Sequence, residues 1–221
     1  VIAAPMAGGP STPALVNAVQ FGFIALGTCT VAQARDWLVE CEPPFGANLF
    51  VPQPEPLPDD VLTVARRLGT EVPDVVSDYA EKFALVLDAA PAVVSSTFGC
   101  FSEAEIAQLH TVGSEAWATV TSPAEIAEAQ RRGVDGVIVQ GPRAGGHRGT
   151  WSQHNEPDQR ALEALLALVN GPVIAAGGVR GPEEVAKLDV PVACGTAFLL
   201  ADEAGTSPRN RELLRSSAPA V

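Results

Sequence analysis

His147 is the residue whose surroundings in the sequence best suit acid–base chemistry. It stands in the glycine-rich segment Arg143–Gly149, directly after the apolar run Gly136–Gln140. An imidazole titrates near neutral pH, so a histidine in such a loop can take a proton from carbon; taken alone, it can equally cap a turn or lie in solvent. His110 ends a predicted helix, where it favours the helix dipole, and His154 lies among polar loop residues. His147 is therefore the candidate catalytic base.

Two side-chain amides lie at the ends of apolar runs. Asn48 belongs to the run Gly46–Phe50, and Gln140 closes the run that precedes the histidine loop. Each amide presents a donor and an acceptor, which suits the edge of a heterocycle such as a flavin and equally suits the backbone of a loop. Pro5 and Met6 follow the first apolar run, where Met6 can pack on a ring or fill the interior of the fold. We take these four residues as candidate ligand contacts.

Two glycine-containing turns follow consecutive apolar runs near the end of the chain. Glycine lets the backbone approach a ligand closely, so that N–H groups can point at phosphate oxygens. Either turn alone is more typical of an ordinary chain reversal, but two such turns at neighbouring strand ends favour a phosphate site, which α/β barrels often form there. Gly145 and Gly146 of the histidine loop belong to the same candidate site. The residues of the two turns are Ala176, Gly177 and Gly178, and Ala193, Cys194, Gly195 and Thr196.

Alternating strands and helices must position these residues. Short apolar runs alternate with helical patterns, which predicts a single α/β domain over residues 1–221, a TIM (β/α)8 barrel of parallel strands with a helical insertion after strand 3. Active sites of such barrels lie at the C-terminal ends of the strands, where the candidate residues fall. The expected strands are Val1–Ala4, Phe23–Ala25, Gly46–Phe50, Ala92–Ser95, Ala116–Val120, Gly136–Gln140, Pro172–Ala175 and Val190–Cys194. The expected helices are Thr12–Gln20, Val31–Glu40, Asp59–Leu68, Val75–Ala89, Ser102–His110, Ser122–Arg132, Asp158–Val169, Pro182–Leu188 and Arg209–Arg215.

Local signals favour the barrel over a doubly wound open sheet. The first turn, Pro5–Pro10, lacks the G-x-G-x-x-G spacing that often follows the first strand of the open-sheet fold. Ser102 with Glu105, and Ser122 with Glu125, are spaced as capping boxes that begin helices. The connection between the last two expected strands is the weakest part of the prediction, because it is short for a crossover.

The composition excludes several classes of protein. A formal net charge of −12, spread along the chain, repels nucleic acids and anionic membranes. No stretch approaches the roughly 20 apolar residues of a membrane span, and no signal peptide is visible. The four cysteines lack C-x-x-C spacing and the histidines are too few for a zinc site. We therefore expect no metal, reduced thiols and a cytoplasmic protein.

Five segments together resemble the nitronate monooxygenases, formerly called 2-nitropropane dioxygenases. They occur in the order of that family, cover most of the chain and are jointly very specific, the Ala-Gly-Gly-His-Arg-Gly block above all. The resemblance implies a TIM barrel that binds FMN non-covalently, with His147 as the catalytic base. The flavin or phosphate contacts that it implies come from Asn48, Gln140, Gly145, Gly178 and the Ala193–Thr196 segment. The matching segments are Ala4–Gly9, Gly46–Phe50, Gln140–Gly149, Pro172–Gly178 and Gly195–Leu199.

The resemblance also implies a reaction, in which O2 oxidises a small nitronate or nitroalkane to a carbonyl compound and nitrite. One alternative is an FMN-dependent NAD(P)H reductase of the enoyl-acyl-carrier-protein or NADH:quinone type, since such enzymes can share the Gly-Gly-His loop. A second alternative is a barrel that binds a phosphate-bearing metabolite without redox chemistry. The family pattern after the eighth strand is mostly absent from the chain. The oligomeric state stays open, and a homo-oligomer is compatible with the sequence.

Overall fold

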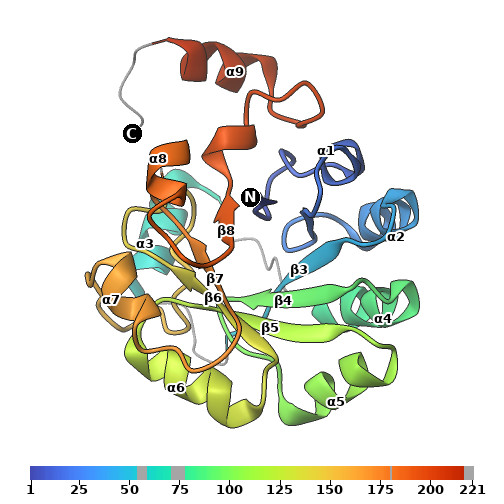
Figure 1. Cartoon of the computed structure of the whole chain (residues 1–221). Helices are drawn as coiled ribbons and strands as arrows, with labels where there is room; N and C mark the ends of the chain where they lie inside the picture. The colour runs from blue at the N-terminus through green and yellow to red at the C-terminus, as the bar shows by residue number, and fades with distance from the viewer. Residues whose placement is uncertain (54–58, 71–77, 180, 217–221) are drawn as a thin grey trace.

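The strands form one parallel barrel that is nearly closed (Figure 1). The computed structural model describes residues 1–53, 59–70, 78–179 and 181–216. The strand order is β1-β8-β7-β6-β5-β4-β3-β2, and β1 meets β2 through one bridge between Ala3 and Gly22, beside which the Ala3 N–H donates to the Phe21 carbonyl at 3.1 Å. The predicted barrel is confirmed, and the doubly wound alternative is wrong. The strands are β1 (Ile2–Ala3), β2 (Phe23–Ala25), β3 (Gly46–Phe50), β4 (Val93–Thr97), β5 (Glu115–Val120), β6 (Gly136–Gln140), β7 (Val173–Ala176) and β8 (Val192–Cys194).

Helices connect consecutive strands and cover the outside of the barrel (Figure 1). The predicted insertion after strand 3 is present as α3 (Asp59–Leu68) and α4 (Tyr79–Ala89); residues 75–77 of the expected second helix lie outside the described residues. Three of the other helices are at least three residues shorter than predicted, namely α1 (Pro13–Ala18), α7 (Leu162–Leu166) and α8 (Pro182–Val185). The remaining helices are α2 (Val31–Glu40), α5 (Glu103–Thr111), α6 (Pro123–Arg132), the 3₁₀ helix η1 (Thr196–Phe198) and α9 (Pro208–Arg215).

The two predicted capping boxes behave differently. At α5 the Ser102 hydroxyl accepts the Glu105 N–H at 3.2 Å, and the Glu105 carboxylate accepts the Ser102 N–H at 2.7 Å, so the box is complete. At α6 the Ser122 hydroxyl accepts the Glu125 N–H at 3.3 Å, but the Glu125 carboxylate accepts the Thr121 N–H instead. The prediction of a full box at Ser122 is wrong, because Glu125 is used for contacts outside its own helix.

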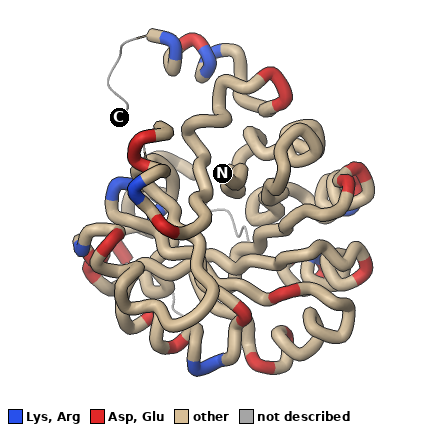
Figure 2. The backbone as a smooth tube through the Cα atoms, in the orientation of Figure 1, with Lys and Arg blue, Asp and Glu red and all other residues tan. Residues whose placement is uncertain are grey.

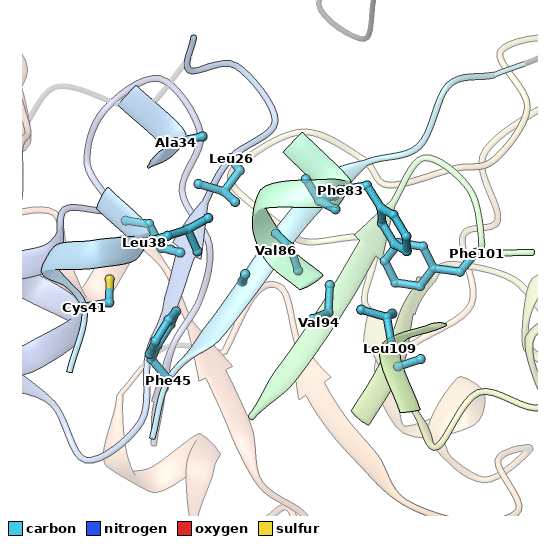
Figure 3. Close-up of a cluster of buried hydrophobic side chains, with 14 of the residues drawn as sticks. Leu26, Ala34, Leu38, Cys41, Phe45, Phe83, Val86, Val94, Phe101 and Leu109 are labelled. Carbon is cyan, nitrogen blue, oxygen red and sulfur yellow. The ribbon is translucent and has the colours of Figure 1, made fainter. Parts of the chain in front are cut away.

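The largest apolar cluster packs α2, α4 and α5 against the neighbouring strands (Figure 3). Val86, Val94 and Phe101 of this cluster are completely buried, and burying one such side chain contributes roughly 1.5–3 kcal/mol. Acidic and basic residues lie mainly on the helices and outer turns (Figure 2). In the described ranges no helix combines the length and apolarity needed to cross a membrane, and no three metal-binding side chains gather.

Candidate active site

The His147 imidazole lies at the C-terminal mouth of the barrel, between the ends of β3 and β4. Its ring centroid is 6.4 Å from that of Phe50 and 6.0 Å from that of Phe98, and both ring pairs meet edge to face. His147 is exposed, and among the described residues neither ring nitrogen has a hydrogen-bond partner. An imidazole in this setting is free to exchange a proton with a ligand at the mouth.

The Gln140 side chain holds the histidine loop from its upstream end. Its Oε1 accepts the Gly149 N–H at 2.9 Å, and its Nε2 donates to the His147 carbonyl at 2.9 Å. Both ends of the amide are thus engaged by the loop backbone, which was one of the two expected uses of this side chain. A contact of Gln140 with a flavin remains a prediction.

Arg148 fastens the same loop to the barrel rather than facing a ligand. Its guanidinium donates to the carbonyl of Gln140, and to those of Thr121 and Asp158 at 3.0 Å each. Burial lowers the pKa of the Arg148 guanidinium, while the carboxylates of Glu125 and Asp158 act in the opposite direction. The side chain next to His147 therefore serves the geometry of the loop.

The downstream end of the loop is held by residues that the sequence did not single out for the site. The Trp151 indole donates to the Thr119 carbonyl at 2.8 Å, and the Trp151 N–H donates to the Glu125 carboxylate at 2.9 Å. Gln53, which follows β3, donates to the Trp151 carbonyl at 3.0 Å. Phe98, whose ring contacts His147, has a φ of 65°, a conformation that non-glycine residues rarely adopt. None of these roles has a local sequence signal.

Asn48 is buried and spans the β3–β4 pair. Its Nδ2 donates to the Ser95 carbonyl at 3.2 Å, to the Ser95 hydroxyl at 2.9 Å and to the Thr97 hydroxyl at 3.0 Å. The Thr97 hydroxyl continues the network to Thr119 of β5 at 3.3 Å. The amide thus lies in a polar layer beneath the barrel mouth, and its predicted contact with a flavin stays a prediction.

The glycine turns after β7 and β8 come together with the histidine loop, as predicted. Gly177 and Gly178 have φ values of 83° and 80°, and a Cβ atom added at Gly178 would lie 2.5 Å from the Arg143 Cβ. A Cβ added at Gly145 would lie 3.4 Å from the Thr196 hydroxyl. The histidine loop therefore packs so closely on the turn after β7 that a side chain at Gly178 would clash, and it lies within van der Waals distance of the turn after β8.

The remaining predicted residues surround this junction. A Cβ added at Gly195 would lie 3.4 Å from the Met6 Cγ, and the Met6 N–H donates to the Ser11 hydroxyl at 2.8 Å. Pro5 is half-buried in the same turn, and Gly146 is exposed beside the histidine. Ala176 pairs with Ala193 in the register of β7 and β8. Burial raises the pKa of the Cys194 thiol, so this thiol stays protonated near neutral pH.

The three loops carry backbone donors that the protein itself does not use. In the part of the chain that the structure describes, these N–H groups donate to no protein acceptor. Successive unpaired N–H groups in glycine turns form concave sites for anions, so the residues present fit a phosphate group. No acidic residue interrupts the stretch 141–149. The N–H groups belong to Gly145, Gly146, Gly177, Gly178, Gly195 and Thr196.

A cavity of about 380 Å³ lies beside this junction, between α7 and α8. Arg143 and Val179 line it on the side of the glycine turns, and Leu162 and Leu188 supply apolar walls. None of the predicted contact residues lines the cavity, so we distinguish it from the site at the barrel mouth.

The fold and the site define a class of protein: a TIM barrel whose last two strands end in glycine turns, with a histidine at its mouth that has no hydrogen-bond partner on its ring among the described residues. The model of the family described as nitronate monooxygenase matches residues 1–219. The chain belongs to this family of oxidoreductases. A nitronate monooxygenase of Pseudomonas aeruginosa is 31% identical over 97% of this chain and 70% of its own length. A probable nitronate monooxygenase of Bacillus subtilis is 30% identical over 96% of this chain and 69% of its own.

Solved structures agree with this assignment. The nitroalkane oxidase of Streptomyces ansochromogenes has a TM-score of 0.83 and 34% identity, covering 98% of this chain and 70% of that one. FabK of Thermotoga maritima has a TM-score of 0.72 at 23% identity, covering 98% of this chain and 64% of that one, which supports the fold alone. The resemblance drawn from the sequence motifs is confirmed at the level of the family.

Proposed function

We propose that this protein oxidises small alkyl nitronates, and neutral nitroalkanes after their deprotonation, with FMN as cofactor and O2 as oxidant. The observation that carries the proposal is a combination of two features: His147 lies at the barrel mouth, and the adjoining glycine turns hold N–H groups that donate to no acceptor among the described residues. The names of the relatives, nitronate monooxygenase and nitroalkane oxidase, support the same substrate class.

The residues of the chain take separate parts in this reaction. The backbone N–H groups of Gly178, Gly195 and Thr196 would bind the phosphate of FMN, and Met6 and Asn48 would contact its ring system. The imidazole of His147 accepts the α-proton of a neutral nitroalkane, which leaves the nitronate anion. Electron transfer from this anion to O2, with release of a carbonyl compound and nitrite, is chemistry that FMN supplies when bound.

The proposed location is the cytoplasm. Cys29, Cys41, Cys100 and Cys194 are all free thiols, which suits a reducing compartment. The net charge of −12 supports a protein without nucleic-acid partners.

The test combines the visible spectrum of the purified protein with oxygen uptake by His147→Asn. We expect FMN absorbance in both proteins, with turnover of neutral nitroethane reduced about 100-fold or more in the variant, the usual contribution of a general base. Turnover of preformed ethylnitronate should persist, because that anion needs no deprotonation. The matched control is His154→Asn, at an exposed loop histidine, which should change neither rate.

Two results would contradict the proposal. Undiminished nitroethane oxidation by His147→Asn removes the histidine from the role of base. If the purified protein shows no flavin absorbance and also fails to bind added FMN, the assignment of FMN as cofactor is wrong. If NADH rapidly bleaches the bound flavin in the absence of O2, the protein is a reductase instead.

A further inference from the structure

One side chain joins three segments of the barrel mouth. The Nε2 atom of Gln53 lies 3.3 Å from the Phe98 carbonyl oxygen, 3.2 Å from that of Thr150 and 3.0 Å from that of Trp151. The two Nε2 hydrogens are thus shared among three carbonyls on chain segments that are 45 to 98 residues away in sequence. Gln53 is half-buried, so these contacts are partly shielded from competing water.

Each acceptor of Gln53 belongs to a segment that contacts or contains His147. Phe98 supplies a ring 6.0 Å from the imidazole, centroid to centroid. Its φ of 65° is a left-handed conformation, which is strained for an L-residue and persists where surrounding contacts hold it. Thr150 and Trp151 end the loop that begins at the histidine, so Gln53 fixes both the wall beside the imidazole and the loop that carries it.

The other anchors of the loop do not replace this contact. Gln140 holds the His147 carbonyl and the Gly149 N–H from β6, and Glu125 holds the Trp151 N–H from α6. These anchors place the loop relative to β5 and β6. Gln53 alone among these three side chains connects the loop to the segment after β3 and to the segment after β4, where the aromatic partners of the imidazole lie.

We infer that Gln53 is a positioning residue for His147, which sets the imidazole against Phe98 at the distance and angle needed to take an α-proton. This inference rests on the proposed function, because it assumes that His147 is the base. Without the amide donor, Phe98 and the end of the loop lose their common anchor. Small displacements of a catalytic group lower rates steeply, by up to about 100-fold for 1 Å, and we expect about a 10-fold loss here.

The test compares Gln53→Met with Gln130→Met. Gln130 is a matched control, because its Nε2 also donates to a loop carbonyl, that of Asn170 at 2.7 Å, on a segment that leads into β7 rather than out of β6. We expect Gln53→Met to lower kcat/KM for neutral nitroethane about 10-fold relative to ethylnitronate. Gln130→Met should leave the ratio of the two substrates unchanged.

A second measurement tests the inference without cofactor or turnover. Hydrogen exchange of cofactor-free protein, followed by mass spectrometry, should show faster exchange in peptides covering 147–151 for Gln53→Met but not for Gln130→Met. If the wild-type protein proves to have no nitroalkane activity, the proposed function fails, while this exchange difference still decides whether Gln53 holds the histidine loop. If Gln53→Met does not fold, Gln53→Glu, which sets a carboxylate against the three carbonyls, takes its place.

Two results would overturn the inference. An equal loss of both substrates in Gln53→Met would mean that the side chain supports the fold and not the imidazole. If hydrogen exchange of the loop is unchanged in Gln53→Met, and the ratio of kcat/KM for nitroethane to that for ethylnitronate is unchanged as well, Gln53 does not position His147.

Discussion

The barrel contains two arcs of strands that are built differently, one from β3 to β6 and the other from β7 through β8 to β1. In the arc β3–β6, β3 pairs with β4 over five residues, and β4–β5 and β5–β6 each pair over four. In the arc from β7 to β1, the pairing of β7 with β8 and the pairing of β8 with β1 each extend over only two residues. The helices follow the same division: α4, α5 and α6 have 11, 9 and 10 residues, whereas α7 and α8 have 5 and 4.

The difference matches the two tasks of the proposed site. Side chains around the arc β3–β6 hold the loop of His147, through Gln53, Glu125 and Gln140. The arc β7–β1 carries backbone N–H groups, at Gly178 and its neighbours, that find no acceptor among the described residues. A base needs a fixed orientation before the substrate arrives, which demands a well-packed support. Phosphate-binding amides need only an accessible backbone, and a ligand that binds the folded state adds stability there.

The largest expected effect tests whether the arc β3–β6 carries the stability of the fold. Phe101 is fully buried in the cluster of Figure 3, so Phe101→Ala should lower the free energy of unfolding in urea by about 3–5 kcal/mol. The control is Leu213→Ala on α9, where the side chain is 51% exposed and the change should stay within about 0.5 kcal/mol. A loss below roughly 1 kcal/mol for Phe101→Ala, far short of the usual cost of such a cavity, would remove this contrast.

The second prediction concerns the donors of the arc β7–β1. Gly178→Ala places a Cβ on a backbone with a φ of 80°, 2.5 Å from the Arg143 Cβ, so the turn must move. We expect FMN affinity, measured by fluorescence titration, to fall about 10-fold or more, because the clash with Arg143 displaces the N–H donors of the turn and a lost hydrogen bond to a charged group costs roughly 1.5–3 kcal/mol. The matched control is Gly113→Ala, which has a φ of 82° but open space around its Cβ, in the loop between α5 and β5.

Gly113→Ala should lose stability through the same backbone strain and yet bind FMN normally. If both alanine variants bind FMN equally well, the turn at Gly178 does not hold the phosphate. If both lose affinity equally, the effect comes from general destabilisation. Either result would break the assignment of the donors to the arc β7–β1.

Much of the fold could be predicted because its signals are local. The bounds of β3 and β6, of α2 and of α3 match the expected ranges, since apolar runs and helical periodicity mark them directly. The prediction for α7 was too long by four residues at its start. The Asp158 side chain accepts the Arg160 N–H at 2.8 Å, which is a local turn, and the Asp158 carbonyl accepts the Arg148 guanidinium at 3.0 Å. The local turn and the contact with Arg148 both hold Asp158 outside the helix.

The residues of the candidate site also differ in whether the local sequence could reveal them. His147 and Gly178 were predictable, because a histidine among glycines and a glycine turn after an apolar run are visible in the local sequence. Gln53 was not, because its acceptors are 45 to 98 residues away. Glu125 even carried a misleading local signal: its spacing from Ser122 predicted a capping box, whereas its carboxylate reaches Trp151. Contacts that depend on three folded loops leave no pattern in any one of them.

The smallest expected effect uses two thiols to compare the arcs. Burial, with the nearby Glu40 carboxylate, raises the pKa of the Cys41 thiol in the main cluster to about 12. Burial also raises the pKa of Cys194 at the end of β8, but there the α-amino group of Val1 acts in the opposite direction. An unfolded thiol titrates near pH 8.5, so folding retains these protons to higher pH. The resulting stability is complete below about pH 8.5 and is lost as pH rises above that value.

Thermal or urea unfolding between pH 8 and pH 9.5 measures this loss. For Cys41 it should reach about 1.4 kcal/mol at pH 9.5, because the unfolded thiol is then mostly ionised while the folded one is not. Cys41→Ala should therefore flatten the decline of stability with pH, and Cys194→Ala should flatten it less. An equal flattening by both variants would show that the β7–β1 arc shields its thiol as well as the β3–β6 arc does, and the contrast in packing would not extend to solvent access.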